Sequence, residues 1–512
     1  MLVKVYGAAL LGVNAVIVTI EVNCSKGIKF FLVGLPDVSI KESHERITSA
    51  LSENGLKFPR KQIVVNMAPA DMRKEGAAYD LPLAIGILAG AEKIKPDRIG
   101  HYMMMGELSL DGSLKPVKGV LPIAIKAKES GFKGIILPKT NAREAAVVTS
   151  LEVYGVDNII EVIRFFNEEQ QLEPTIVDPR KEFYENQALT PWNFSEVKGQ
   201  ESVKRAIEVA CAGGHNIILI GPPGAGKSML AKRIPSILPP LNLNESLETT
   251  KIHSVAGKIN HNGSLIAARP FRSPHHSISM VAMVGGGSYP QPGEISLAHN
   301  GILFLDEIAE FGRNVLEVLR QPLEDRKITI SRAKFSVDYP AGFMLVASMN
   351  PCPCGHYNNP NKPCVCAPLQ VQKYINRISG PLMDRIDIQI EIVPVPFDAI
   401  SDIRPAESSE DIRNRVIHAR KVQAGRFHSE EGIYCNAQMH TRLLHKHAQP
   451  DQEGLKKLKD AMTRLNLSAR AYDRILRVSR TIADLDASDN VKASHIAEAI
   501  SYRNLDRENW AG

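Results

Sequence analysis

Residues 221–228 read Gly-Pro-Pro-Gly-Ala-Gly-Lys-Ser and fit the pattern G-x-x-x-x-G-K-[ST] at every position. An apolar run at 217–220 leads into this stretch and helix-forming residues follow it at 229–232, which is the setting of a phosphate-binding loop between a strand and a helix. Such a loop turns its backbone N–H groups and the start of the helix toward an anion. The residues expected to cradle the phosphates of ATP are Gly221, Pro222, Pro223, Gly224, Ala225 and Gly226. Lys227 is expected to contact the β- and γ-phosphates, and the Ser228 hydroxyl to bind Mg²⁺.

Two further strands of the expected sheet end in polar side chains. The buried run 302–305 is followed by Asp306 and Glu307, and the next apolar run leads to Asn350. After a phosphate loop in the same sheet, Asp306 is expected on the Mg²⁺ side and Glu307 beside the attacking water, which it would polarise. An amide at Asn350 would position water or sense the γ-phosphate. Because Pro351 follows, a turn-forming asparagine is the alternative.

The chain has 512 residues, which are too many for one domain of about 150 residues. Its composition and hydrophobic pattern divide it into segments. Residues 1–168 mix strand-like and helical runs, which indicates an α/β unit. Residues 169–191 are rich in Glu, Gln and Pro and lack a hydrophobic period, as a linker does. From 192 to 397 fully apolar strands alternate with helices, which predicts an α/β fold with a parallel sheet covered on both faces. From 398 to 512 the pattern is helical.

The bulk composition is that of an ordinary globular protein. A net charge of +6 permits binding to a polyanion but does not argue for it. Seven cysteines, an odd number, argue against a secreted disulfide framework. The apolar run 8–20 is shorter than the roughly 20 residues that cross a bilayer, and residues 16–23 alternate as a strand does. We therefore expect a cytoplasmic protein without a membrane partner.

Three further stretches carry a family resemblance. Residues 269–276, 292–301 and 350–355 read Arg-Pro-Phe-Arg-Ser-Pro-His-His, Pro-Gly-Glu-Ile-Ser-Leu-Ala-His-Asn-Gly and Asn-Pro-Cys-Pro-Cys-Gly. They resemble magnesium-chelatase-like AAA+ ATPases, and the likeness to the ComM/YifB family covers nearly the whole chain. This resemblance implies a hexameric ring that shares each ATP site between neighbouring subunits. It also implies a branch-migration helicase that acts on single-stranded or branched DNA in recombination during natural transformation.

The resemblance assigns two arginines to the ATP site. Residues 383–387 resemble the family's arginine-finger segment, so Arg385 would reach the ATP of the neighbouring subunit and stabilise charge on the transferring phosphoryl group. Arg377 is the alternative finger. The segment ending at Arg470 resembles the sensor of a helical lid, which makes Arg470 a contact to the nucleotide of its own subunit. The arginines spaced to share one helix face are Arg470, Arg474 and Arg477. A solvated stripe with salt-bridge partners is therefore the alternative.

Two stretches of the N-terminal unit, 75–84 and 106–139, resemble the Lon-protease-like domain, which has a ribosomal S5-like fold. In Lon the first carries a nucleophilic serine and the second a lysine that activates it. Here the serine position reads as Leu83 and the lysine position as Leu121. A leucine supplies neither a nucleophile nor a base. The sequence therefore predicts a structural or nucleic-acid-facing domain without a catalytic dyad.

Four cysteines lie within fifteen residues, as Cys352-x-Cys354 and Cys364-x-Cys366. In a cytoplasmic protein this crowding favours a tetrahedral Zn²⁺ site that ties down a loop. Such a site would be structural, because four thiolates leave no open position for water. Reduced thiols without a metal are the alternative.

Two basic segments are candidates for DNA contacts. Arg269 and Arg272 lie in an insertion of some seventy residues before residue 301. Residues 327–339 read as a β-hairpin, and in related AAA+ helicases a hairpin just before the sensor strand projects into the channel of the ring. Arg332 and Lys334 near its tip would then hold a DNA backbone. A hairpin with ordinary solvated charges is the alternative.

Three other functions compete with a DNA motor. The motor subunit of a magnesium chelatase resembles residues 192–512 but is not built with a Lon-like N-terminal domain. An ATP-switched DNA clamp would bind without moving along the strand. A Lon-like unfoldase-protease conflicts with the leucines at positions 83 and 121.

Overall fold

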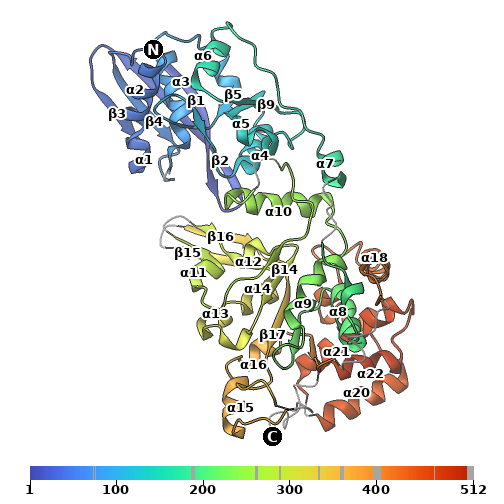
Figure 1. Ribbon diagram of the computed structural model, residues 1–512. Helices are drawn as coiled ribbons and strands as arrows, with labels where there is room; N and C mark the ends of the chain where they lie inside the picture. Colours follow the sequence, from blue (N-terminus) through green and yellow to red (C-terminus); the bar gives the residue numbers. More distant parts are fainter. Residues whose placement is uncertain are drawn as a thin grey trace.

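The computed structural model describes residues 1–72, 74, 76–185, 191–259, 263–287, 290–332, 335–357, 362–395, 405–465 and 467–503, without the side chains of residues 332 and 335. Figure 1 shows an N-terminal unit at the top, a central unit around a second sheet, and a helical C-terminal unit at the lower right. None of the helices in these ranges combines the length and the apolar character needed to cross a bilayer. The expected α/β fold class is confirmed.

A seven-stranded mixed sheet, in the order β3-β4-β2-β1-β5-β8-β9, forms the N-terminal unit. Its strands are β1 (Leu2–Leu11), β2 (Asn14–Ser25), β3 (Phe30–Val33), β4 (Gln62–Ala68), β5 (Tyr102–Met104), β8 (Gly134–Pro138) and β9 (Glu152–Val156). The short strands β6 (Glu107–Leu108) and β7 (Leu114–Lys115) pair with each other. Its helices are α1 (Val38–Lys41), α2 (Ser43–Glu53), α3 (Asp80–Gly90), α4 (Val120–Glu129), α5 (Lys139–Ala145) and α6 (Ile159–Phe166). The alternating run at 16–23 lies in β2, which pairs antiparallel with β1.

The segment expected to be a linker contains a helix. Residues 179–185 form α7 (Pro179–Glu185), and Phe183 and Val177 belong to the hydrophobic core of the N-terminal unit. Arg143 of α5 also binds Glu182 at 2.6 Å. Residues 177–185 are therefore packed on the N-terminal unit, and residues 186–190 lie outside the described part of the chain.

The central unit has a five-stranded parallel sheet in the order β11-β14-β17-β10-β18. Its strands are β10 (Ile217–Ile220), β11 (Phe271–Arg272), β14 (Ile302–Leu305), β17 (Met344–Met349) and β18 (Ile388–Glu391). Every residue of β10, β14 and β17 is buried, because helices cover both faces. The helices of this unit are α8 (Glu201–Gly213), α9 (Lys227–Arg233), α10 (Leu243–Val255), α11 (Met280–Val284), α12 (Glu294–Leu297), α13 (Arg313–Glu317), α14 (Arg320–Asp325), α15 (Pro368–Ile375) and α16 (Gly380–Met383).

Two parts of the central unit contact the N-terminal unit. Helix α10 packs against α4, and the Gly119 N–H donates to the Ser254 carbonyl at 3.0 Å (Figure 1). The predicted hairpin is confirmed as β15 (Lys327–Arg332) and β16 (Phe335–Pro340). The turn between β1 and β2 lies against it, because a Cβ at Gly12 would be 2.5 Å from Val337 Cγ1. The short strands β12 (Gly285–Gly286) and β13 (Gln291–Pro292) complete the insertion.

The regular elements described in the C-terminal unit are helices. They are α18 (Ser409–Arg426), α19 (Thr441–His447), α20 (Gln452–Arg464), α21 (Ala469–Leu485) and α22 (Ala493–Ser501). Helix α21 begins where the Ser468 hydroxyl accepts a hydrogen bond from the Ala471 N–H, a typical N-cap. Apolar residues of α18, α19, α21 and α22 share one core with α8, β10 and β14. The helical C-terminal unit, called the lid below, and the sheet of the central unit therefore share one hydrophobic core.

Candidate nucleotide-binding site

The phosphate loop joins β10 to α9 and depends on its glycines. Gly224 and Gly226 have φ values of 79° and 87°, in the left-handed region that favours glycine. Gly226 is the N-cap of α9, so the first N–H groups of that helix point into the loop. A Cβ at Gly221 would lie 2.5 Å from the Ile392 carbonyl oxygen, so only glycine fits there. The backbone thus adopts the glycine-dependent turn that the motif predicts, and anion binding there stays a prediction.

Lys227 is a buried ammonium group surrounded by neutral oxygens. Its side chain is 8% exposed, and its Nζ donates to the carbonyls of Gly221 at 2.7 Å and Pro222 at 2.9 Å and to Asn350 Oδ1 at 3.1 Å. Burial lowers the pKa of Lys227, against the opposing charges of Asp306 and Glu307. A phosphate oxygen would supply the negative charge that these neutral acceptors lack. The surroundings of this lysine therefore fit an anionic ligand.

Asp306 follows β14 and accepts two hydroxyl groups. Ser228 Oγ donates to its Oδ2 at 2.7 Å, and Ser348 Oγ donates to its Oδ1. Carboxylate and hydroxyl oxygens are ligands that suit Mg²⁺, which usually also keeps water and substrate phosphates. Ser228 and Asp306 are therefore residues that could hold the Mg²⁺ of a nucleotide, as the sequence predicts.

Ser348 is a residue that the sequence analysis did not select. It is fully buried in β17, and its Oγ also accepts a hydrogen bond from the Glu307 N–H at 3.1 Å. One hydroxyl therefore contacts both the Asp306 carboxylate and the backbone of Glu307. The available signal was a single hydroxyl in the otherwise apolar run 344–349.

Glu307 has an exposed side chain and a φ of 52°, which is uncommon for a residue with a Cβ. Such strained conformations occur where the surrounding structure holds a functional group in place. Here the Ser348 hydroxyl and the 3₁₀ turn that begins at Ile308 hold the backbone. The role of this exposed side chain in polarising the attacking water stays a prediction.

Comparison with known proteins agrees with this geometry. Residues 193–400 match the family described as magnesium chelatase, subunit ChlI; residues 20–141 match subunit ChlI of Mg-chelatase, and residues 406–503 match the ChlI C-terminal region. The chain is 43% identical to the uncharacterized protein YifB of Escherichia coli (strain K12), over 98% of this chain and 97% of YifB. It is 42% identical to the competence protein ComM of Haemophilus influenzae, again over 98% and 97%.

The chain belongs to the ComM/YifB family of magnesium-chelatase-like AAA+ ATPases. The resemblance inferred from the sequence is thus confirmed. A stretch of 159 residues is also 28% identical to Lon protease 2 of Bacillus subtilis, over 30% of this chain and 28% of the protease. The fold accordingly combines a Lon-like α/β unit, a P-loop core and a helical lid.

The two candidate arginine fingers of this ComM/YifB relative are bound within their own chain. Arg385 is 14% exposed; it forms an ion pair with Glu324 and donates to the Pro381 carbonyl at 2.7 Å. Arg377 is about half exposed and binds Glu310 at 2.8 Å, in the turn that follows Glu307. The trans role of Arg385 stays a prediction, whereas Arg377 lies where it supports the turn of its own Glu307.

The arginine stripe of α21 divides into an exposed and a buried part. Arg470 is 66% exposed, and its Nη1 lies 3.6 Å from Asp384, the residue before Arg385. Arg474 forms an ion pair with Asp387, which is fully buried and also contacts His215 at 3.3 Å. Asp387 and His215 were not selected from the sequence. They join the lid to the sheet beside the Arg385 segment.

The two arginines of the insertion that are candidates for DNA contacts bind groups of their own chain. Arg269 donates to the carbonyls of Pro239 and Asn300 at 2.6 and 2.7 Å, and it also pairs with Glu245. Arg272 holds Glu294 through two hydrogen bonds of 2.6 and 2.7 Å. Both guanidinium groups thus hold the insertion together, and contact with DNA through them stays a prediction. Lys334 and the side chain of Arg332 lie outside the described residues.

The four cysteines of the loop after Asn350 converge. The Sγ atoms of Cys352 and Cys354 are 3.3 Å apart, and Cys364 Sγ lies 3.6 and 3.5 Å from them. With Cys366, all four Sγ atoms lie within 4.8 Å of one another. This arrangement is able to hold one metal ion.

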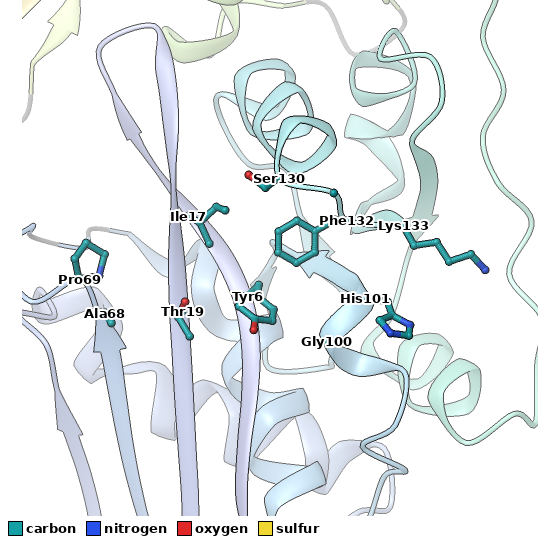
Figure 2. Close-up of a pocket in the computed structure, with 11 residues that line it drawn as sticks. Tyr6, Ile17, Thr19, Ala68, Pro69, Gly100, His101, Ser130, Phe132 and Lys133 are labelled. Carbon is teal, nitrogen blue, oxygen red and sulfur yellow. The ribbon is translucent and has the colours of Figure 1, made fainter.

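The N-terminal unit contains an open pocket of about 690 Å³, bordered by β1, β2 and the end of α4. Figure 2 shows Tyr6 and Phe132 side by side in it, with centroids 5.1 Å apart, and Lys133 directed away from them. None of its lining residues belongs to the phosphate loop or to the strand ends beside it.

Leu83 and Leu121, at the positions of the Lon serine and lysine, are buried in the core of the N-terminal unit, and the stretch 75–84 contains no serine.

Proposed function

We propose that this chain is an ATP-hydrolysing motor acting on DNA, a homohexameric branch-migration helicase of recombination and natural transformation in the cytoplasm. The observation that carries the proposal is the convergence of Lys227, Ser228, Asp306, Glu307 and Asn350 at one edge of the parallel sheet. The partner class rests on the likeness to a protein named for competence over nearly the whole chain.

The chain's own residues divide the work of hydrolysis. Lys227 leaves its carbonyl partners for the β- and γ-phosphates, and Asn350, already 3.1 Å from Nζ, stays beside the γ-phosphate. Mg²⁺ neutralises phosphate charge when it is bound at Ser228 and Asp306. Glu307 accepts a proton from the attacking water. The exact positions of these side chains matter most, because catalysis of phosphoryl transfer relies on the placement of groups and on electrostatic stabilisation.

The ring supplies the remaining charge. Arg385 exchanges Glu324 for the ATP of a neighbouring subunit, and Arg470, which is exposed on the lid, turns to the nucleotide of its own subunit. An arginine that contacts the transferring phosphoryl group in trans makes hydrolysis depend on assembly. Nucleotide state is thereby communicated around the ring.

DNA is held by the hairpin β15–β16. Arg332 and Lys334, which the sequence puts at the turn between the two strands, would contact phosphates without regard to base sequence. At the base of the hairpin, Lys327 is bound to Asp338 at 3.0 Å. Lys327 is therefore not expected to contact DNA, in contrast to Arg332 and Lys334.

A tetrathiolate Zn²⁺ at Cys352, Cys354, Cys364 and Cys366 is proposed as a structural cofactor beside Mg²⁺ and ATP. The three matches to magnesium chelatase subunit ChlI favour a second candidate function, a motor for metal insertion. An ATP-switched DNA clamp shares the same site. A DNA motor should hydrolyse ATP faster with DNA and move along it. A metal-insertion motor should not respond to DNA, and a clamp should bind DNA without moving.

The hairpin variant tests the proposal. Replacing both Arg332 and Lys334 with alanine should weaken DNA binding equally across sequences. It should also flatten the salt dependence, by about 0.7–0.9 in the log–log slope for each phosphate that is no longer neutralised. Lys327→Ala, which removes a charge already paired with Asp338, is the matched control and should leave the slope unchanged. Branch migration should fall only in the double variant. Unchanged DNA affinity and slope there would refute the channel assignment, and binding without any strand movement by the wild type would favour the clamp.

A further inference from the structure

The loop that carries the four cysteines starts directly at the nucleotide site. Asn350 directly follows β17 and contacts Lys227 at 3.1 Å, and Cys352 comes two residues later. The described part of the loop, residues 351–357 and 362–367, leads to α15. A change in the fold of this loop therefore acts on a side chain that contacts the phosphate-binding lysine.

The thiols are arranged as the corners of a metal site. Zinc–thiolate bonds of about 2.3 Å in a tetrahedron place the sulfur atoms roughly 3.8 Å apart. The three Sγ–Sγ separations among Cys352, Cys354 and Cys364, 3.3–3.6 Å, are close to this distance. Two backbone N–H groups, of Tyr357 and Cys366, also point to Cys352 Sγ and Cys364 Sγ at 3.3 and 3.4 Å. Such N–H donors stabilise thiolates, which are the form that binds a metal.

Most of the described residues of this loop, 351–357 and 362–367, are at least partly exposed. Of the four cysteines only Cys352 is buried, and Val365, between the second pair, is 84% exposed. A short segment that buries so little apolar surface gains little hydrophobic stabilisation against its conformational entropy. Four thiolates brought together without a cation would also repel one another. A bound cation removes both difficulties, as it does in small structural zinc sites.

The cysteine loop also contacts the phosphate loop at a second point, Gly355. Gly355 has a φ of 79°, and a Cβ placed on it would lie 2.5 Å from Cδ and 2.9 Å from Cγ of Pro223. The backbone at Gly355 is therefore in close contact with the third position of the phosphate loop. Together with Asn350, this contact supports the cradle from the side of the cysteine loop.

We propose that a zinc ion bound by Cys352, Cys354, Cys364 and Cys366 makes this loop a brace for the phosphate loop, so that zinc binding and nucleotide binding reinforce each other. The inference rests on the proposed nucleotide site and is independent of DNA. Coupling between two binding sites is reciprocal and typically amounts to a factor of about 5–150 in affinity. Loss of zinc should therefore weaken ATP binding, and loss of ATP should weaken zinc binding by the same factor.

The first test measures zinc content and the affinity for a fluorescent ATP analogue with the full-length chain. Wild type should contain one zinc per chain, and the double variant Cys364→Ser/Cys366→Ser should lose it and bind the analogue at least about fivefold more weakly. Cys24→Ala, which changes a buried cysteine of the N-terminal unit, is the control and should retain both properties. If the serine variant is unfolded by circular dichroism, wild type stripped with a zinc chelator and then reloaded replaces it.

The second test breaks the contact and leaves the metal in place. Gly355→Ala should keep its zinc but lose nucleotide affinity, because the new methyl group displaces Pro223. Gly55→Ala is matched to it, since Gly55 has a φ of 76° and no atom within 4 Å of an added Cβ. Equal nucleotide affinity of these two variants would refute the proposal that the cysteine loop braces the phosphate loop.

The third test is reciprocity, measured as the zinc affinity in competition with a chelator, with and without the analogue. The two coupling factors should agree. Absence of zinc from wild type supplied with the ion, or removal of zinc without an effect on nucleotide affinity, would each overturn the inference. A wild type that binds zinc and nucleotide in this coupled way but ignores DNA would instead contradict only the DNA function.

Discussion

Replacing Asp387 with alanine should loosen the helical lid from the nucleotide-binding core. The carboxylate is 1% exposed and receives three partners: Arg474 from α21, His215 at 3.3 Å and the Asn216 N–H at 3.2 Å. Burial alone would raise the pKa of Asp387, but the Arg474 guanidinium and the His215 ring hold it well below its usual range. The charged form is therefore the one that stabilises the fold.

The magnitude follows from the partners left behind. Removing one member of a buried ion pair costs about 3–5 kcal/mol, since the other charge remains uncompensated. Arg474 is 18% exposed and can regain some water, so we expect a loss near the lower end, about 3 kcal/mol. The core and lid share one hydrophobic core and together span residues 192–503. With an unfolding entropy of about 2.1 cal/mol/K per residue, each kcal/mol lowers the melting temperature of such a unit by about 1.5 °C. The transition of the core and lid should then fall by about 4–5 °C.

Scanning calorimetry checks this, with Asp384→Ala as the control. Asp384 pairs with the exposed Arg470 at 3.6 Å, and such surface pairs contribute about 0–1 kcal/mol. Arg474→Ala should lower the transition by a similar amount, and the double variant by less than the sum. Because the folded pKa of Asp387 lies below its unfolded value, the stabilisation is present above pH 3.8 and disappears as pH falls through the folded pKa. A shift for Asp387→Ala no larger than that for Asp384→Ala would refute the reasoning.

Two further predictions concern hydrolysis. Glu307→Gln should retain ATP tightly and lose turnover by a factor on the order of a hundred or more, since the phosphate cradle is untouched and only the water-polarising group is removed; near-normal turnover in a coupled phosphate-release assay would contradict the assignment. Arg385→Ala subunits mixed with Lys227→Ala subunits should regain part of the ATPase rate, because an intact cradle then meets an intact arginine at some interfaces. Full activity of Arg385→Ala alone would transfer the finger role to Arg377.

The phosphate loop was predictable because its information is local. Left-handed glycines, a buried strand before the loop and a helix after it follow from eight consecutive residues and their neighbours. The carboxylate pair at 306–307 was predictable for a similar reason, as the end of an apolar strand in the same sheet. The parallel sheet itself followed from apolar runs separated by helices.

Contacts between distant residues were beyond a single sequence. Asp387 meets His215 across 172 positions, and Ser348 meets Asp306 across 42. Nothing in either local pattern indicates which hydroxyl or imidazole will pair with a buried carboxylate. Arg272 shows the same difficulty. It was a candidate for DNA contact, but it is bound by a glutamate 22 residues away, and the sequence alone does not indicate that pairing.

The polar, proline-containing composition of 169–191 misled in a different way. It suggests a linker, yet Val177 and Phe183 are buried in the N-terminal core and Glu182 is bound by Arg143. Two apolar side chains are too few to form a recognisable period, so their burial depends on the surface that the N-terminal unit offers. Tertiary packing decides such segments.

The central claim, that this ATP site drives a motor on DNA, is tested most directly by the ATPase rate of the wild-type chain with and without a four-way DNA junction. Glu307→Gln serves as the blank that removes hydrolysis and leaves binding. We predict that the wild-type ATPase rate rises with junction concentration to a plateau, while the rate of Glu307→Gln stays flat in the same titration. A wild-type rate well above the blank that the junction leaves unchanged would contradict it.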